Sequence, residues 1–286
     1  MGIQGEAPEL AWGEGRDLSL GWPEPLGSIG IGKRLDLLDA IRPLQGDAVL
    51  DIGCGNGSYT ERLADGFHRV VGVEVERARL EEFAARLVDH PDRDRFELRL
   101  ESAEALSDPA GSYDAVVAIE TLEHVVDAEA AVAEVFRVLR PGGAFYITVP
   151  NRGFPFETHS FMVGGRERRS KWYPFVPWVK PLHRRISTAR NYRPGDLRSL
   201  LEPLGFVEKG TTFLMPPLER WGPGRYLRRP IHALESTPLR HLGVSVVAVF
   251  ERPVEAEPVI DLRDHVLEAE RRAALRAAAA SQRADA

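Results

Sequence analysis

The sequence predicts an α/β protein whose seven-stranded sheet is mostly parallel, ends in an antiparallel strand and carries helices on both faces. Short apolar runs alternate with stretches of helical periodicity over residues 33–150, which is typical of a parallel sheet covered on both sides. The first run, Ala48–Ile52, leads straight into closely spaced glycines and a helical stretch. After residue 193 the alternation resumes and supplies the last strands.

We expect the elements in the following order. An amphipathic helix begins at Lys33 and stops before Pro43. Strands are expected at 48–52, 69–75, 96–100, 113–119 and 144–149, with helices at 58–64, 77–88 and 128–139 between them. A helix at 194–204 precedes strands at 206–214 and 244–250.

These elements define one domain, residues 33–253, with two insertions and two flanking segments. Residues 1–32 are rich in Gly and Pro, which predicts a partly ordered arm or a flap over the site. The insertions, 151–193 and 215–243, are too long for ordinary connections and are interpreted as functional lids. Residues 254–286 are charged and rich in Ala, which predicts a helical or disordered tail.

Composition narrows the classes of protein. The chain has 43% hydrophobic and 28% charged residues, as in ordinary globular proteins, and no apolar run long enough to suggest a membrane span. The first residues do not resemble a secretory signal, so we expect a cytoplasmic protein. A single cysteine, Cys54, excludes an internal disulfide. The net charge of −6 argues against a generally basic nucleic-acid binder.

The strongest functional signal is the loop that follows the first strand. Gly53, Gly55 and Gly57 allow a tight turn and the close approach of a ligand, and Glu74 ends the next strand, where a carboxylate can accept hydrogen bonds from ribose hydroxyls. The third glycine comes one residue earlier than in the dinucleotide fingerprint G-x-G-x-x-G. The spacing therefore favours a nucleoside ligand without a pyrophosphate.

The motifs together resemble class I S-adenosylmethionine-dependent methyltransferases, within the type 11 group that includes ubiquinone-pathway enzymes. The matching segments are Asp51–Gly57, Val71–Glu74, Ala103–Leu106, Ser112–Asp114, Leu122–Val125 and Leu139–Gly143. The resemblance covers about residues 33–150. It implies a Rossmann-like fold, S-adenosylmethionine as cofactor and S-adenosylhomocysteine as product.

The resemblance also implies roles for single residues. The glycines would line the methionine part of the cofactor, Asp51 would order the loop, and Glu74 would bind the ribose. Ser102 stands where many relatives have Asp beside the adenine, which implies binding with altered affinity. The cofactor site is expected to comprise Asp51, Gly53, Gly55, Gly57, Glu74, Ser102, Ala103, Glu104 and Glu120. Asp114 is expected to support its strand.

A hydroxyl acceptor must lose its proton, which suits a histidine or a carboxylate as base. The candidates are Glu120, His124 and His159. Glu120 and His124 follow the fourth strand, four residues apart, and would share a face if that stretch is helical. A packing role for His124 is the equal alternative.

The first insertion supplies the candidate acceptor-binding residues, which are Asn151, Glu157, His159, Trp172 and Tyr173. Glu157 and His159 suit acceptor hydroxyls or a base role, or they anchor the lid. Two potential ligands without a third make a metal ion the less favoured interpretation, so no metal is expected.

Both insertions concentrate positive charge and aromatic rings in an acidic protein. This pattern suits an anionic acceptor, such as a lipid-linked or nucleotide-linked sugar, or peripheral contact with an anionic membrane. A solvated lid whose aromatics pack on the core is the alternative. RNA is disfavoured because Ile119-Glu120-Thr121-Leu122 differs from the Asn-Pro-Pro-aromatic motif of amino-methylating nucleic-acid enzymes. The basic residues of the two insertions are Arg166, Arg168, Arg169, Lys171, Lys180, Arg184, Arg185, Arg190 and Arg193 in the first and Arg220, Arg225, Arg228 and Arg229 in the second.

The sequence thus predicts a methyltransferase that acts at oxygen on a small-molecule, sugar or lipid-linked acceptor. Nitrogen or carbon methylation is the nearest alternative. A non-catalytic protein that binds S-adenosylmethionine and serves interactions is an alternative of another class, and an NAD-dependent dehydrogenase is a remote one.

Overall fold

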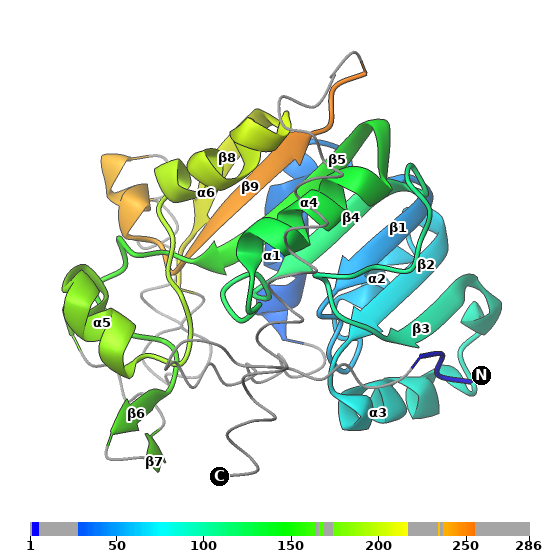
Figure 1. Cartoon of the computed structure of the whole chain (residues 1–286), viewed down its shortest axis with the longest axis horizontal. Helices are drawn as coiled ribbons and strands as arrows, with labels where there is room; N and C mark the ends of the chain where they lie inside the picture. The colour runs from blue at the N-terminus through cyan, green and yellow to red at the C-terminus, as the bar shows by residue number, and fades with distance from the viewer. Residues whose placement is uncertain are drawn as a thin grey trace, which may run out of the picture.

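A computed structural model describes residues 2–5, 28–163, 166–168, 174–216, 234 and 237–254. Its centre is a seven-stranded sheet in the order β3-β2-β1-β4-β5-β9-β8 (Figure 1). The pairs from β3 through β5 are parallel, whereas β9 runs antiparallel to both of its neighbours. The predicted fold class is confirmed.

The strands are β1 (Gly46–Ile52), β2 (Phe67–Glu74), β3 (Phe96–Leu100), β4 (Tyr113–Ile119), β5 (Leu139–Pro150), β8 (Val207–Leu214) and β9 (Ser245–Glu251). The helices around them are α1 (Ile29–Ile41), α2 (Thr60–Leu63), α3 (Arg77–Leu87), α4 (Ala128–Val138) and α6 (Pro194–Leu201). The bounds expected for β3 and β4 agree with the structure.

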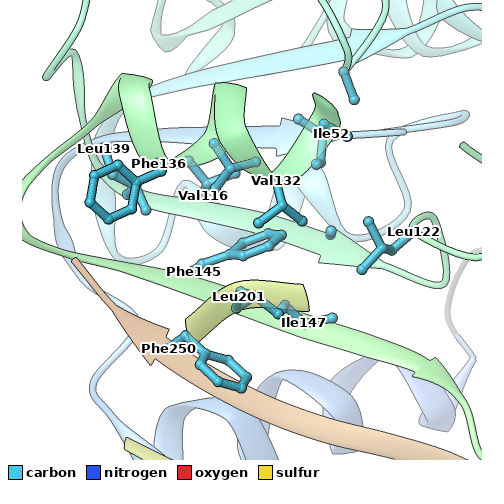
Figure 2. Packing of buried hydrophobic residues seen from close by; sticks show 14 of the residues in the cluster. Ile52, Val116, Leu122, Val132, Phe136, Leu139, Phe145, Ile147, Leu201 and Phe250 are labelled. Carbon is cyan, nitrogen blue, oxygen red and sulfur yellow. The ribbon is translucent and has the colours of Figure 1, made fainter. Parts of the chain in front are cut away.

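Alternation along the central strands divides the core into two layers. Leu50 and Val116 belong to the layer shared with α4 and α6, whereas Val49 and Val117 belong to the layer shared with α1 and α3. Successive side chains of a strand point to opposite faces, so a strand buried on both sides needs an unbroken apolar run. Figure 2 shows the first layer, where Phe136 of α4 and Phe145 of β5 lie between the helices and the sheet.

Helix α1 begins four residues before the predicted start at Lys33. Ser28 caps it, because the Ser28 side chain accepts a hydrogen bond from the Gly30 amide. Gly30 and Gly32 have low helix propensity, so the sequence pattern did not predict a helix over this first turn. Leu38 packs this helix against the sheet and is fully buried.

Strand β5 also begins earlier than predicted. Residues 140–143, which precede the strand expected at 144–149, belong to β5. Tyr113 pairs with Leu139, and the register shifts between Tyr113 and Ala115. Gly142 has a positive φ, which a turn requires and which a bulged strand also tolerates at glycine. The local sequence therefore does not distinguish a turn from a bulged strand at these residues.

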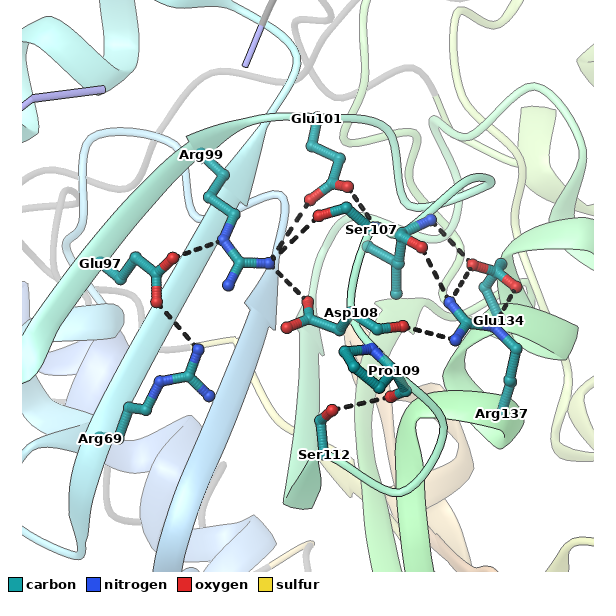
Figure 3. Close-up of polar contacts among 11 residues, drawn as sticks. Arg69, Glu97, Arg99, Glu101, Ser107, Asp108, Pro109, Ser112, Glu134 and Arg137 are labelled. Atoms are coloured by element: carbon teal, nitrogen blue, oxygen red, sulfur yellow. Dashed lines mark hydrogen bonds and ion pairs between the residues drawn. The ribbon is translucent and has the colours of Figure 1, made fainter. Parts of the chain in front are cut away.

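A polar network holds the loop between β3 and β4 (Figure 3). Arg99 donates to Glu97 on its own strand and to Asp108 in the loop, at 2.8 and 2.7 Å. From α4, Glu134 accepts the Leu106 amide and Arg137 donates to the Leu106 carbonyl, each at 2.8 Å. The loop that follows β3 is therefore fixed from two sides.

The first insertion contains structure that the sequence did not predict. Strands β6 (Phe161–Val163) and β7 (Arg166–Arg168) form a hairpin, followed by the 3₁₀ helix η2 (Val176–Trp178) and by α5 (Lys180–Ile186). These elements lie beyond the carboxyl end of β5, to the left of the sheet in Figure 1. Across the described ranges, none of the helices combines the length and apolar character that crossing a bilayer requires.

Parts of the predicted flanks lie outside the described residues. This applies to the tail from residue 255, most of the second insertion and residues 6–27 of the arm. Residues 2–5 are described, and Gln4 pairs alongside β3, exchanging backbone hydrogen bonds with Leu98 and Leu100. Part of the predicted arm therefore extends the edge of the sheet.

Candidate functional site

The glycine loop turns directly off β1. The Gly53 amide donates to the Val73 carbonyl of β2 at 2.8 Å, and Gly53, Gly55 and Gly57 all have positive φ. A Cβ at Gly53 would lie 2.4 Å from the Thr121 side chain, so no larger residue fits there. The loop therefore lies against the segment that follows β4, which brings two predicted parts of the site together.

Glu74 ends β2 with its carboxylate buried beside this loop. One oxygen accepts the Gly55 amide at 3.0 Å, and the other accepts the amides of Val75 and Glu76. A carboxylate offers about four acceptor positions, and backbone groups occupy three of them. Glu74 thus joins the loop to the end of β2. About one acceptor position of its carboxylate remains for the ribose, which is fewer than the predicted binding of two ribose hydroxyls would use.

Asp51 is buried at the end of β1 and accepts a hydrogen bond from the Thr60 hydroxyl at 2.7 Å. Burial raises its pKa to about 7, the Thr60 hydrogen bond lowers it in part, and the charge of Glu74 raises it further. Asp51 therefore ties α2 to the strand. Cys54 is also buried, and burial holds its thiol pKa well above the usual value, in keeping with a packing role.

The predicted adenine-side residues follow β3. Ala103 is buried, and the Ser102 hydroxyl accepts the Glu104 amide at 3.3 Å. The Glu104 carboxylate accepts the amides of Val126 and Asp127, at 2.7 and 3.0 Å. Glu104 therefore anchors the segment before α4 with its side chain, whereas its backbone stays in the loop that follows β3.

The segment after β4 is a turn, so the condition under which Glu120 and His124 would share a helical face is not met. Glu120 has a φ of 52°, in the left-handed region that residues other than glycine rarely adopt, and the next helix begins at Ala128, capped by Asp127. Glu120 accepts the Thr148 hydroxyl at 3.1 Å and lies 3.8 Å from the Arg34 guanidinium. His124 instead turns toward the first insertion.

Three ionisable side chains meet there. One Glu123 oxygen lies 3.8 Å from His124 Nε2 and 3.8 Å from His159 Nε2, and the two rings are 5.4 Å apart. Burial and the nearby charge of Glu120 raise the Glu123 pKa well above its ordinary value, which favours the neutral acid. The structure thus brings two predicted bases, His124 and His159, beside a carboxyl group that the sequence analysis had not singled out.

This group also has the composition of a metal site. Glu123, His124 and His159 each place one potential ligand atom within 4.8 Å of the others. The two potential ligands expected from the sequence were Glu157 and His159, and no metal was expected; the structure instead groups His159 with Glu123 and His124. Glu123 lies in the matching segment Leu122–Val125, but no spacing in the sequence pairs it with His159, because the two residues belong to different segments.

Glu157 lies behind His159, buried with His183. One Glu157 oxygen accepts the amides of Thr158 and His159, and the other lies 2.8 Å from His183 Nε2. Burial acts to raise the Glu157 pKa, but hydrogen bonds from both imidazoles outweigh it and hold the pKa at about 2. Glu157 is therefore an ionised internal group near neutral pH.

The other predicted acceptor residues divide into two sets. Asn151 is buried, and its amide nitrogen donates to the carbonyls of His241 and Gly243 while its oxygen accepts the Gly153 amide. These bonds tie the end of β5 to the segment before β9, so the side chain is engaged in holding the insertion. Trp172 and Tyr173 lie outside the described residues.

One of the predicted cations, Arg190, also stabilises the fold. Arg190 donates to the carbonyls of Val125 and Val126, and its amide donates to the Glu123 carbonyl. Lys180 and Arg185 are exposed on α5. Nothing is described for the side chains of Arg166, Arg168 and Arg184, and Arg169, Lys171, Arg220, Arg225, Arg228 and Arg229 lie outside the described residues.

Arg34 is a site residue that sequence reasoning missed. It comes from α1, donates to the Tyr59 hydroxyl at 3.0 Å and faces Glu120. No local pattern distinguishes it from other charges on an amphipathic helix. Its guanidinium adds positive charge between the glycine loop and the segment after β4.

The described residues fit S-adenosylmethionine. Glycines with positive φ leave backbone room for the methionine part, the buried Glu74 offers an acceptor for a ribose hydroxyl, and Ala103 offers an apolar contact for the adenine. Arg34 offers a partner for a carboxylate. Each chemical part of the cofactor thus finds a suitable group at the carboxyl ends of β1 to β4.

Comparisons with known proteins agree with this geometry. Residues 50–147 match the family model described as a methyltransferase domain. The chain is 29% identical over 188 residues to a ubiquinone biosynthesis O-methyltransferase of Chelativorans sp. (65% of this chain, 70% of the relative). It is 34% identical over 154 residues to one of Aromatoleum aromaticum (52% and 64%). A solved S-adenosylmethionine-dependent methyltransferase from Mesorhizobium loti aligns with a TM-score of 0.54 and 18% identity, over 76% of this chain and 96% of that one.

The extent of these matches sets what they support. For most curated relatives the match spans between 39% and 64% of their own length. The family model matches residues 50–147, and the likeness to the solved structure concerns the fold.

Proposed function

Because the chain carries a class I S-adenosylmethionine-dependent methyltransferase domain, we propose that it methylates a hydroxyl oxygen of a small-molecule or lipid-linked acceptor. The observation that carries the choice of oxygen is the pair of imidazoles, His124 and His159, beside the end of β4. Hydroxyl acceptors need a group that takes their proton, and histidine suits this task near neutral pH.

The cofactor side would hold S-adenosylmethionine through the glycine loop, Glu74 and the loop after β3. When bound, the cofactor supplies an electrophilic methyl group on a sulfonium, and the protein aligns the acceptor with it. Arg34 would pair with the methionine carboxylate, and Asp51 would keep the loop and α2 in place.

The acceptor side would hold and deprotonate the hydroxyl. His159 is partly exposed, and its Nε2 faces Glu123 and His124, so it is the imidazole best placed to take a proton from an entering acceptor. Glu123 lies 3.8 Å from Nε2 of each imidazole, and its raised pKa favours a neutral group that adds no charge beside them. The curated relatives named above are O-methyltransferases, which supports the choice of oxygen over nitrogen or carbon.

The first test is calorimetric titration of the protein with S-adenosylmethionine, S-adenosylhomocysteine and NAD, followed by a radiolabelled methyl-transfer screen. The screen compares diphenols, sugars and lipid-linked hydroxyls with amine analogues. We expect binding of the first two ligands and transfer to hydroxyls. Transfer only to amines would overturn the oxygen assignment, and binding without any transfer would favour a non-catalytic protein.

We further propose that this is a cytoplasmic protein that contacts an anionic membrane surface peripherally. Phe175, Trp178, Val179 and Leu182 are exposed hydrophobic residues in or next to η2 and α5, and Lys180 and Arg185 are exposed on α5. Apolar side chains flanked by basic ones suit the interface of anionic lipids.

Vesicle co-sedimentation tests this surface. Phosphatidylglycerol vesicles should bind the protein and phosphatidylcholine vesicles should not. The Leu182→Ser variant should lose binding, whereas Val207→Ser, which removes an exposed apolar residue of β8, should keep it. Equal binding by both variants would show that this surface does not contact the membrane.

A further inference from the structure

A row of ionisable groups, of which all but His159 are buried, crosses the acceptor side of the site. It runs from His183 of α5 through Glu157 and His159 of the first insertion to Glu123 after β4. Successive side-chain atoms are 2.8, 3.6 and 3.8 Å apart. His183 and Glu157 are nearly fully buried, so their interaction is shielded from solvent.

We propose that His183 is a positioning residue, which holds the Glu157 carboxylate so that this carboxylate orients the His159 imidazole toward the acceptor. The importance of this orientation for turnover rests on the proposed function. The orientation itself rests only on the row of contacts.

The two oxygens of Glu157 contact different groups. One accepts the backbone amides of Thr158 and His159 and lies 3.6 Å from His159 Nδ1. The other faces His183 Nε2. Without His183, the buried carboxylate would lose the imidazole that lies 2.8 Å from its second oxygen, and it would have to turn or take up a proton. Either change releases the backbone and the ring of His159.

The two nitrogens of His159 face different groups. Nδ1 lies near Glu157 and 3.2 Å from the Thr158 hydroxyl, whereas Nε2 faces Glu123. A carboxylate at Nδ1 favours the tautomer that carries its proton there, and this leaves the Nε2 lone pair for a proton from the acceptor. His183 therefore sets the tautomer of a ring that it does not touch.

Backbone contacts hold the same two segments together independently of Glu157. The Thr188 amide and hydroxyl both donate to the Ser160 carbonyl, at 3.1 and 3.0 Å, and Phe161 pairs with Ser187. Thr188 is buried and does not contact Glu157 in the described contacts. The Thr188→Val variant thus loosens the same junction without removing the imidazole, which makes it the matched control.

The experiment uses nitrogen-15 NMR of the histidine rings in full-length protein saturated with S-adenosylhomocysteine. Spectra are taken in a chelator, about 2 pH units above the ordinary histidine pKa of about 6.5. His159→Ala assigns the signal. We expect a dominant Nδ1–H tautomer for His159 in the wild type and in Thr188→Val, and loss of that dominance in His183→Leu. His183→Gln, whose amide can still donate to Glu157, should restore it in part.

Turnover gives the second readout, with a hydroxyl compound that the screen has shown to be methylated. His183→Leu should lower kcat about tenfold and leave the KM for S-adenosylmethionine unchanged, as for residues that orient a functional group from behind. An unchanged His159 tautomer in folded His183→Leu or an equal change in Thr188→Val would reject the proposal. If no acceptor is methylated, the proposed function fails, while the NMR result still decides the positioning role.

Discussion

The two sides of the candidate site are built in different ways. On the cofactor side, Gly53 and Glu74 belong to one continuous unit of strand, loop, helix and strand, and backbone hydrogen bonds fix both. On the acceptor side, Glu123, His159 and His183 come from three segments that are far apart in the sequence, and their side chains line up with Glu157 only where these segments pack together. The comparison shows that a short continuous motif encodes the cofactor side, whereas long-range packing creates the acceptor side.

Replacing Gly53 by Ala should have the largest effect, because it places a side chain inside the continuous strand–loop–helix–strand unit of the cofactor side. The new Cβ would meet Thr121 at 2.4 Å in a backbone with positive φ. We expect a loss of about 2 to 5 kcal/mol in the free energy of unfolding, measured in urea, and no detectable cofactor binding by calorimetry.

Gly111→Ala is the matched control. Gly111 has the same φ of 71°, but a Cβ added there would meet nothing within 4 Å. It should lose only about 1 to 2 kcal/mol, from the backbone alone, and keep cofactor binding. Equal losses in the two variants would show that contact with Thr121 is unimportant.

Asp51→Asn should change how stability depends on pH. The folded-state pKa, about 7, lies above the ordinary value of 3.8, so folded protein retains a proton that the unfolded chain releases between these values. The free energy of unfolding therefore falls as pH rises through this window and levels off above about 7. The fall is on the order of 4 kcal/mol, and Asn should remove it.

Urea unfolding at several pH values measures this slope. Asp47→Asn, which changes an exposed carboxylate of the same strand, should leave it intact. The assignment would be wrong if Asp51→Asn kept the wild-type slope.

His159→Ala sharpens the comparison from the acceptor side. We expect about 10²-fold slower methyl transfer, the lower end of the range for a lost general base, with unchanged cofactor affinity by calorimetry. His124→Ala should behave similarly if it shares the proton, and should destabilise the fold if it only packs. His68→Ala, at an exposed position of β2, should change neither quantity.

Glu74→Ala should produce the smallest of these effects, a tenfold to hundredfold weaker affinity for S-adenosylmethionine, because hydrogen bonds to a charged group are lost. Since Glu74 also accepts the Gly55 amide, part of the loss comes from the loop. Glu76→Ala, two residues later and partly exposed, is the control. Normal affinity in Glu74→Ala would contradict its role at the ribose.

The sequence predicted the fold class, the bounds of β3 and β4 and the supporting role of Asp114, which accepts the Asp47 and Ala48 amides and pairs with Arg140. It placed α1 four residues late, because Gly30 and Gly32 obscured a helix whose cap is Ser28. It also treated Asn151 as an acceptor ligand, although its amide is engaged with the backbone near β9.

The sequence by itself determined the sheet and the cofactor side, because strand alternation, positive-φ glycines and an acid at the end of the next strand act over short distances along the chain. Only the tertiary structure decided that Arg34 reaches Glu120, and that His183, Glu157, His159 and Glu123 form one row. These pairings depend on how α1 and the insertion after β5 pack against the sheet. Packing of that kind leaves no fixed spacing in the sequence.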